Sequence, residues 1–159
     1  RLVPQKRVDL VLEAFARLRA LDAWSFQILG DGPEREALAL LAEQRGIAGR
    51  VRFHGHVDPF AQLYAADVFV LASDFEGMPN ALLEAMACGV VPIVNDATPG
   101  PLEFVEHDRT GLVVPAGDLD ALALRDFQAI PPPERAAIKT EVRLDKRHFA
   151  RTRELARLR

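Results

Sequence analysis

The sequence predicts an α/β domain built on a doubly wound parallel sheet. Short apolar segments of strand length alternate with segments whose apolar residues recur at helical spacing. The segment 67–72 carries an apolar run, as expected of a parallel strand that is buried on both faces. Strands and helices that alternate in this way form parallel sheets with helices on both sides.

Three helices and two strands are expected before the strand at 67–72. Apolar residues at helical spacing predict the first helix, and Pro33 and Gly46 mark the start and the end of the second. Asp58 and Pro59 open the third helix, and short apolar segments predict both strands. In chain order these elements are helix 6–21, strand 24–29, helix 33–45, strand 51–54 and helix 58–66.

The alternation continues in the second half of the chain. Gly89 ends a helix, and Asp118 caps the last one. The elements expected here are helix 80–88, strand 90–95, helix 102–106, strand 111–114 and a helix from 118 toward 129. The run Pro131-Pro-Pro133 separates a domain over residues 1–130 from a helical C-terminal extension over 131–159.

The composition is ordinary for a globular protein and excludes several classes. The 159 residues suit one domain, with 49% hydrophobic and 27% charged residues. A net charge of −3 gives no electrostatic basis for nucleic-acid binding. Cys88 is the single cysteine, so we expect a small buried residue in a reducing, cytoplasmic compartment. No apolar run approaches the roughly 18 residues of a membrane helix, and no signal peptide is visible.

Two glutamates flank the start of the helix expected at 80–88. Glu76 lies in the loop at the carboxyl end of a strand, where ligands bind in open α/β sheets, and Glu84 lies one turn into the helix. The helix N-terminus between them offers free N–H groups to a phosphate. Glu84 can accept two hydrogen bonds from a ribose diol, while Glu76 reaches a sugar beyond the phosphates. The spacing suits a sugar–diphosphate–nucleoside, although isolated glutamates at this spacing are usually solvated.

Several segments together resemble the large group 1 family of retaining glycosyltransferases, which have GT-B architecture. The family's Glu-x7-Glu motif is similar to Glu76-Gly-Met-Pro-Asn-Ala-Leu-Leu-Glu-Ala-Met-Ala-Cys-Gly89. Its Gly-Arg-Leu-x-x-x-Lys segment is similar to Arg1-Leu-Val-Pro-Gln-Lys6. Two further landmarks follow in the family's order, Phe26-Gln-Ile-Leu-Gly-Asp-Gly-Pro33 and Val51-Arg-Phe-His-Gly55.

The resemblance implies a role for each matching residue. Glu84 would hold the nucleotide ribose, and Glu76 a hydroxyl of the donor sugar. Arg1 and Lys6 would bind the diphosphate and offset charge on the leaving group, which makes a metal unnecessary. The residues expected to bind the nucleotide-sugar, besides these catalytic ones, are Glu84, Gly77, Met78, Pro79, Asn80, Ala81, Leu82, His56 and Val57. The reaction would transfer a sugar from a UDP- or GDP-sugar with retained anomeric configuration.

The resemblance also implies what lies outside these residues. The family's first strand of this domain and its N-terminal acceptor domain would precede Arg1. We therefore expect a donor-binding half that is inactive alone, with an acceptor glycan or lipid-linked sugar bound by the missing domain. The other interpretation of this start is a processed domain boundary. The segment Asn95-Asp-Ala-Thr-Pro-Gly-Pro-Leu-Glu103 departs from the commoner Gly-Gly-x-x-Glu of the family.

Two other function classes stay open. A nucleotide-sugar epimerase would share the architecture, although epimerases lack the Glu-x7-Glu phrase in this form. A non-catalytic nucleotide-sugar-binding module is the other. The segment 134–159 carries nine Lys/Arg against four Asp/Glu, which predicts either a solvated helix face or peripheral contact with an anionic membrane.

Three smaller patterns have competing structural and functional interpretations. Gly30-x-Gly32 lacks the third glycine of a dinucleotide fingerprint and predicts a tight strand-to-helix turn. Asp118-Leu-Asp120 resembles a metal-binding Asp-x-Asp motif, but a helix cap explains it better. His54 and His56 share a strand face without nearby carboxylates or cysteines, so we expect no metal there.

Overall fold

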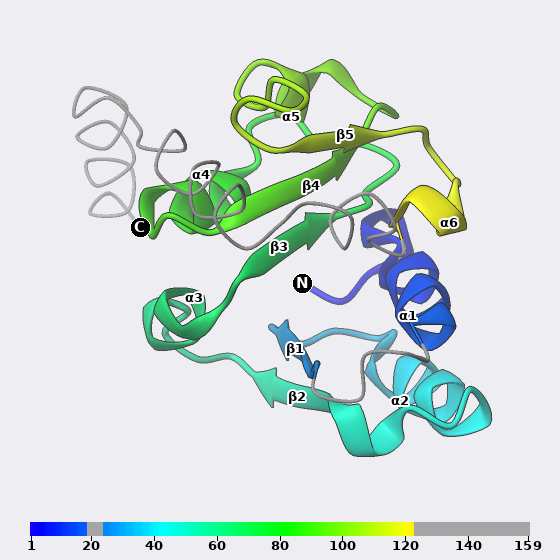
Figure 1. Ribbon diagram of the computed structural model, residues 1–159. Helices are drawn as coiled ribbons and strands as arrows, with labels where there is room; N and C mark the ends of the chain where they lie inside the picture. The colour runs from blue at the N-terminus through cyan, green and yellow to red at the C-terminus, as the bar shows by residue number, and fades with distance from the viewer. Residues whose placement is uncertain (19–23, 123–159) are drawn as a thin grey trace.

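The computed structural model describes residues 1–18 and 24–122, in which strands and helices alternate (Figure 1). The strands are β1 (Phe26–Leu29), β2 (Val51–Gly55), β3 (Val68–Leu71), β4 (Val91–Asn95) and β5 (Leu112–Val114). The helices are α1 (Val8–Arg17), α2 (Arg35–Gln44), α3 (Phe60–Ala65), α4 (Asn80–Ala87), α5 (Pro99–Leu102) and α6 (Leu119–Leu122). Two 3-10 turns are η1 (Pro4–Lys6) and η2 (Ala48–Arg50). The extension expected at 131–159 lies outside the described residues.

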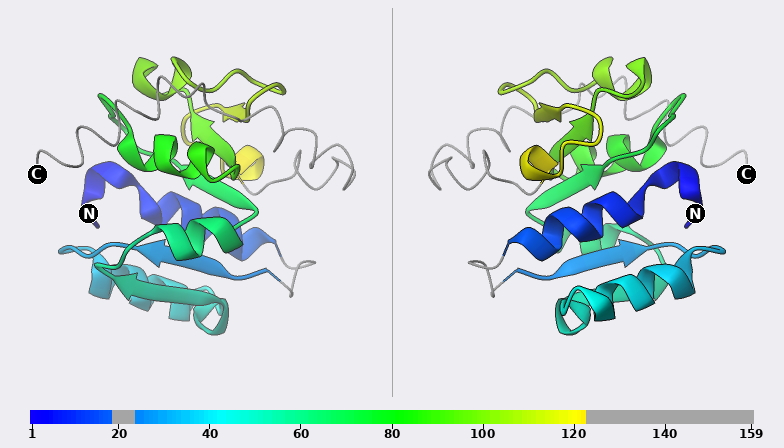
Figure 2. Two further views of the ribbon diagram at one scale, coloured as in Figure 1. Left: turned by 90° about the vertical axis from the view of Figure 1, so that its left-hand side faces the viewer. Right: turned by 90° about the vertical axis from the view of Figure 1, so that its right-hand side faces the viewer.

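Helices cover the strands on both sides. α1, α2 and α6 lie on one side and α3 and α4 on the other (Figures 1 and 2). Every pairing between the named strands is parallel: β1 with β2, β3 with β4, and β4 with β5. The predicted parallel α/β architecture is therefore confirmed.

The strands form two separate sheets instead of one continuous sheet. β1 and β2 make a two-stranded sheet, and β3, β4 and β5 make a three-stranded sheet. The free edges of β1 and β3 line one common cleft. The expectation that segment 67–72 is buried on both faces is wrong, because β3 is an edge strand beside this cleft. All residues of β3 are only partly buried, whereas all residues of β4 are buried.

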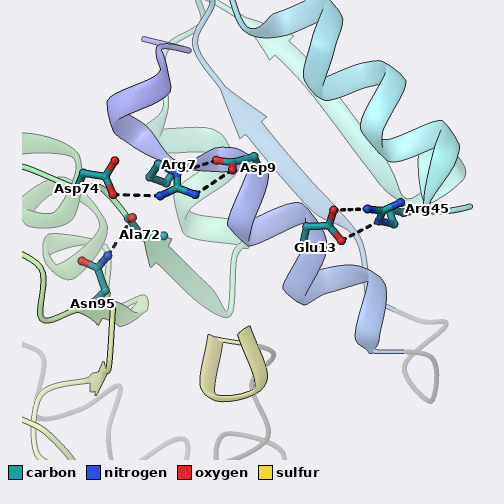
Figure 3. Close-up of polar contacts among 7 residues, drawn as sticks. All are labelled: Arg7, Asp9, Glu13, Arg45, Ala72, Asp74 and Asn95. Atoms are coloured by element: carbon teal, nitrogen blue, oxygen red, sulfur yellow. Dashed lines mark hydrogen bonds and ion pairs between the residues drawn. The ribbon is translucent and has the colours of Figure 1, made fainter. Parts of the chain in front are cut away.

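The apolar face of α1 supplies much of the core, as its helical spacing predicts. Leu12 is fully buried, and Phe15 stacks at a tilt on Phe26 of β1 with ring centroids 5.7 Å apart. α1 and α2 are also joined at the surface, where Arg45 donates two hydrogen bonds to Glu13 at 2.6 and 2.7 Å (Figure 3).

Four predicted helix starts, those of α1, α2, α3 and α5, are wrong by two or three residues, and two of them have a clear backbone cause. α1 begins at Val8 and not at Lys6, because Arg7 adopts a left-handed conformation, with φ 48°, between η1 and the helix. α5 covers 99–102 and not 102–106. Thr98 is extended, and Pro99 sits where a helix tolerates proline best, in its first turn. The cap at Asp118 is confirmed, since its Oδ1 accepts hydrogen bonds from the amides of Asp120 and Ala121 at 3.0 Å.

The turn between β1 and α2 packs against the start of the chain. Leu2 N–H donates to Asp31 O at 2.9 Å, and Glu34 N–H donates to Leu2 O at 3.2 Å. A Cβ at Gly32 would lie 2.2 Å from Leu2 O, so this position requires glycine. The interpretation of Gly30-x-Gly32 as a tight strand-to-helix turn is confirmed.

Candidate functional site

A cleft of about 1750 Å³ opens at the carboxyl ends of the strands and continues between β1 and β3. It is larger than the roughly 300–1000 Å³ of a typical ligand pocket, because it includes the space between the two sheet edges. Most residues singled out by the sequence line it: Arg1, Lys6, His56, Val57, Glu76, Met78, Pro79, Asn80, Ala81 and Glu84. The fold therefore brings these distant segments to one place.

Two side chains hold the carboxylate of Glu76. Its Oε1 lies 2.5 Å from Lys6 Nζ and accepts a hydrogen bond from Ser73 Oγ at 2.7 Å. Its side chain is only 10% exposed, against 32% for Lys6. A carboxylate with a charged donor and a hydroxyl donor is fixed in one orientation. Glu76 therefore presents a preset oxygen to the cleft.

The loop carrying Glu76 is tied to the η1 turn by further hydrogen bonds. Asp74 N–H donates to Gln5 O at 2.9 Å, and Gln5 Nε2 donates to Phe75 O at 2.6 Å. Neither Gln5 nor Ser73 was singled out from the sequence. Gln5 is about as far along the chain from its partners as Lys6 is from Glu76, and no local pattern signals a contact of that range.

The opposite side of the Glu76 loop rests on the β4–α5 connection. Thr98 Oγ1 donates to Glu76 O at 3.1 Å, and a Cβ at Gly100 would lie 2.2 Å from Gly77 O. The buried Asn95 donates from Nδ2 to Ala72 O at 2.9 Å, at the end of β3 (Figure 3). Gly100 of the Pro-Gly-Pro segment thus supports the Glu76 loop, because a side chain at this position would collide with the Gly77 carbonyl.

Glu84 is partly buried in α4 and lines the cleft. Burial raises its pKa, and the negative charge of Asp58 raises it further. No described residue donates a hydrogen bond to its carboxylate. A carboxylate that is desolvated and unpaired is suited to accept two hydroxyl donors from a ligand.

Some backbone amides at the start of α4 donate hydrogen bonds within the protein, and others do not. Asn80 N–H donates to Met78 O, and Leu82 N–H donates to Pro79 O, at 3.0 and 2.9 Å. The amides of Gly77, Met78 and Ala81 donate to no residue in the described part of the chain. The start of α4 therefore keeps free N–H groups and the positive end of its dipole beside the cleft.

Leu82 and Gly77 do not line the cleft as the other members of the predicted set do. Leu82 is fully buried and packs in the core with Met86, Val94 and Val105. Its amide is also occupied inside the first turn, so it has no group to offer a ligand. Gly77 is exposed beside the lining residues, with open space where a Cβ would stand.

His56 and Val57 follow β2 and line the cleft, with Val57 43% exposed. Arg1 also lines the cleft, and no hydrogen bond or ion pair joins its side chain to the residues the structure describes. Arg1 is exposed, which leaves its guanidinium available to an anion.

His54 and Cys88 are the remaining groups that the sequence raised as candidates. His54 Nε2 lies 2.6 Å from Gln27 Oε1 on the neighbouring strand. Within residues 1–18 and 24–122, no group of three His, Cys, Asp or Glu could hold a metal ion. Cys88 is partly buried, and burial raises the pKa of its thiol. No helix in the same ranges is long and apolar enough to cross a membrane.

The sequence model of the family "Glycosyl transferases group 1" matches residues 1–135. The chain belongs to this family. The predicted membership is therefore confirmed. A relative from Rhizobium meliloti (strain 1021), the lipopolysaccharide core biosynthesis glycosyltransferase LpsE, is 41% identical over 126 residues, covering 77% of this chain and 35% of the relative. A second relative is the GDP-mannose-dependent α-(1-6)-phosphatidylinositol monomannoside mannosyltransferase of Mycobacterium tuberculosis (strain ATCC 25618 / H37Rv). It is 37% identical, and the match covers 77% of this chain and 34% of the relative.

Two solved structures have a fold similar to that of this chain. TarM of S. aureus, in complex with fondaparinux, α-GlcNAc-glycerol and UDP, has a TM-score of 0.84 and 25% identity, covering 90% of this chain and 30% of TarM. HepE of Anabaena, in complex with UDP and glucose, has a TM-score of 0.78 and 26% identity, covering 90% of this chain and 40% of HepE. This group 1 chain spans about a third of the length of the curated relatives named above.

Proposed function

We propose that this chain is the donor-binding half of a group 1 glycosyltransferase, and that the whole enzyme transfers a sugar from a nucleotide-sugar to an acceptor with retention of configuration. One observation carries the proposal. Glu76, fixed by Lys6 and Ser73, shares a cleft with Glu84, which no described residue pairs, and the free amides of Gly77, Met78 and Ala81 lie between the two glutamates in the chain. A sugar, a diphosphate and a ribose match that order of groups.

Each group has a distinct task in this proposal. Glu84 accepts the two ribose hydroxyls, while the amides of Gly77, Met78 and Ala81 hold the phosphates. The bond between the anomeric carbon and the diphosphate oxygen breaks, the acceptor hydroxyl oxygen takes its place on the same face, and the hydroxyl proton leaves with the departing diphosphate. Lys6 and Arg1 offset the negative charge that develops on the departing diphosphate. The ammonium group of Lys6 has three N–H donors and donates one hydrogen bond to Glu76, so two donors are left for phosphate oxygens.

We propose UDP or GDP as the nucleotide and no metal requirement. UDP occupies the TarM and HepE complexes, whereas the mycobacterial relative is named for GDP-mannose. Titrating UDP, GDP and ADP onto the chain by calorimetry distinguishes the bases. Repeating the titration with a chelator should leave the affinity unchanged, because fixed cations replace the metal's charge. Loss of binding on chelation would contradict the metal-free proposal.

We propose that the acceptor is a glycan or a lipid-linked sugar and that the enzyme works in the cytoplasm, with peripheral membrane contact. Relatives named for lipopolysaccharide core and for phosphatidylinositol monomannoside support the acceptor class. The basic segment 134–159 that would make the contact lies outside the described residues. Flotation of the chain with vesicles containing anionic lipid, against neutral vesicles, tests the contact.

Replacing Glu84 tests the function directly. Glu84→Ala removes the ribose acceptor and should weaken binding of the preferred nucleotide roughly 10- to 100-fold, since a hydrogen-bonded charge is lost. Glu43→Ala, an exposed glutamate on α2, is the matched control and should bind as wild type. Wild-type affinity in Glu84→Ala would overturn the assignment.

A further inference from the structure

Arg7 has a backbone conformation that arginine rarely adopts. Its φ and ψ are 48° and 40°, in the left-handed region that favours glycine. Asp108 is the other non-glycine residue with positive φ in the described part of the chain, and it does not line the cleft. Strained backbone persists where surrounding contacts over-determine it, and it clusters at functional sites. Arg7 directly follows Lys6, so its conformation calls for an explanation at the site.

The side chain of Arg7 makes a fork between two segments. Nε and Nη2 donate to the two oxygens of Asp9 at 3.2 and 3.1 Å, which fixes the guanidinium against the first turn of α1. Nη1 reaches across to Asp74 Oδ1 at 3.3 Å (Figure 3). Asp74 belongs to the loop after β3, which also carries Glu76. The fork therefore connects the element that follows Lys6 with the loop that presents Glu76.

This fork works together with backbone contacts between the same two segments. Asp74 N–H donates to Gln5 O at 2.9 Å, so residues on both sides of Lys6 hold Asp74. Lys6 Nζ and Glu76 Oε1, 2.5 Å apart, form the innermost contact of this arrangement. Asp74 is 58% exposed and solvent screens its ion pair, so the expected contribution is geometric and modest in size.

We propose that Arg7 is a positioning residue, which holds the Lys6 turn against the Glu76 loop and thereby sets the geometry of the Lys6–Glu76 pair. The proposal rests on the function proposed above, because it assigns that pair to the sugar–diphosphate end of the donor. It explains why arginine stands in a conformation suited to glycine. Glycine would relieve the strain but would lose the fork.

The decisive variant is Arg7→Gly, with Asp108→Gly as its matched control. Both substitutions relieve a positive φ, so neither should lower the melting temperature much. Arg7→Gly should weaken binding of UDP-glucose roughly 3- to 10-fold. UMP lacks the β-phosphate and the glucose, so the affinity of Arg7→Gly for UMP should stay within about twofold of the wild-type affinity. GDP-mannose and GMP replace these probes if the wild-type chain prefers guanine. Asp108→Gly should bind both probes as wild type.

Three further measurements separate a positioning role from a general structural role. Asp74→Ala should reproduce the loss of UDP-glucose affinity and should add little to it in the Arg7→Gly background. Amide hydrogen exchange at Asp74 N–H, measured without ligand, should be faster in Arg7→Gly than in wild type. Arg7→Lys keeps the charge without the fork and should restore only part of the affinity.

The outcomes also distinguish this inference from the proposed function. If wild type binds UDP-glucose and Arg7→Gly binds it equally well, the positioning role is wrong and the donor site stands. Equal loss of UMP and UDP-glucose affinity would point to general disruption of the site and would also overturn the role. Unchanged exchange at Asp74 N–H would show that Arg7 does not hold the loop. Failure of wild type to bind any of these nucleotides would overturn the function and this inference with it.

Discussion

Glu84 shows at the scale of one residue how a binding role opposes stability. Its carboxylate is partly buried, lacks a described donor and lies near the charge of Asp58. Both burial and Asp58 raise its pKa, so the free protein resists the ionised form that a ribose diol requires. A donor that supplies two hydroxyls would relieve this penalty on binding.

The raised pKa predicts a pH-dependent stability effect. Between the ordinary value of 4.5 and the raised one, the folded state binds more protons than the unfolded state, so stability falls as pH rises through this window. Glu84→Gln removes the penalty and should raise the free energy of unfolding at about pH 7 but not below about pH 4.5. Urea unfolding at both pH values measures this, with Glu43→Gln as control. A variant less stable than wild type at neutral pH would contradict the desolvation account.

At the scale of elements, the site depends on a contact between two connections that follow neighbouring strands. The β3–α4 loop presents Glu76, and α5 packs against that loop through Gly100. Thr98 adds a side-chain hydrogen bond to the Glu76 carbonyl. The two connections meet because β3 and β4 are parallel neighbours, so their carboxyl ends lie at the same edge.

Gly100→Ala tests this contact. Its Cβ would lie 2.2 Å from Gly77 O, so backbone must move, at a cost of about 1–3 kcal/mol. Donor affinity should also fall, because the displaced backbone carries Glu76. The control is Gly49→Ala, where nothing lies within 4 Å of the added methyl and φ is not positive. Differential scanning calorimetry measures the loss of stability, and nucleotide titration measures the loss of donor affinity. Wild-type stability in Gly100→Ala would show that the Glu76 loop can move aside without cost.

At the scale of the whole molecule, the division into two sheets distributes stability unevenly. Val68 on β3 and Val91 on β4 are direct partners in one ladder, yet Val91 is fully buried and Val68 is partly exposed to the cleft. The same residue type on paired strands therefore experiences different surroundings. The open edge of β3 is the cause.

These two valines make a matched pair for a stability measurement. Val91→Ala should cost about 2 kcal/mol through lost burial and a residual cavity, and Val68→Ala less than about 1 kcal/mol. Equilibrium unfolding of the 159-residue chain gives both values. Equal costs would mean that β3 is buried in solution and that the gap between the sheets is closed.

The alternation of strands and helices, the turn at Gly32, the cap at Asp118 and the family are all predictable from the amino-acid sequence. These features depend on local spacing, backbone preference and motif residues close together in the chain. The errors of the sequence-based prediction also have local causes. Apolar spacing does not reveal that Arg7 adopts a left-handed conformation. A Pro-Gly-Pro run suggests a loop, although Pro99 suits the first turn of a helix.

Long-range packing, which the sequence does not reveal, sets which groups support the site and how the strands divide into two sheets. Gln5, Ser73 and Thr98 hold the Glu76 loop, mostly across long stretches of chain, and their types alone carry no signal of such contacts. Leu82 sits inside the motif but belongs to the core, because its helical position turns it away from the cleft. Whether β1 pairs with β3 is likewise set by long-range packing, which sequence periodicity does not record.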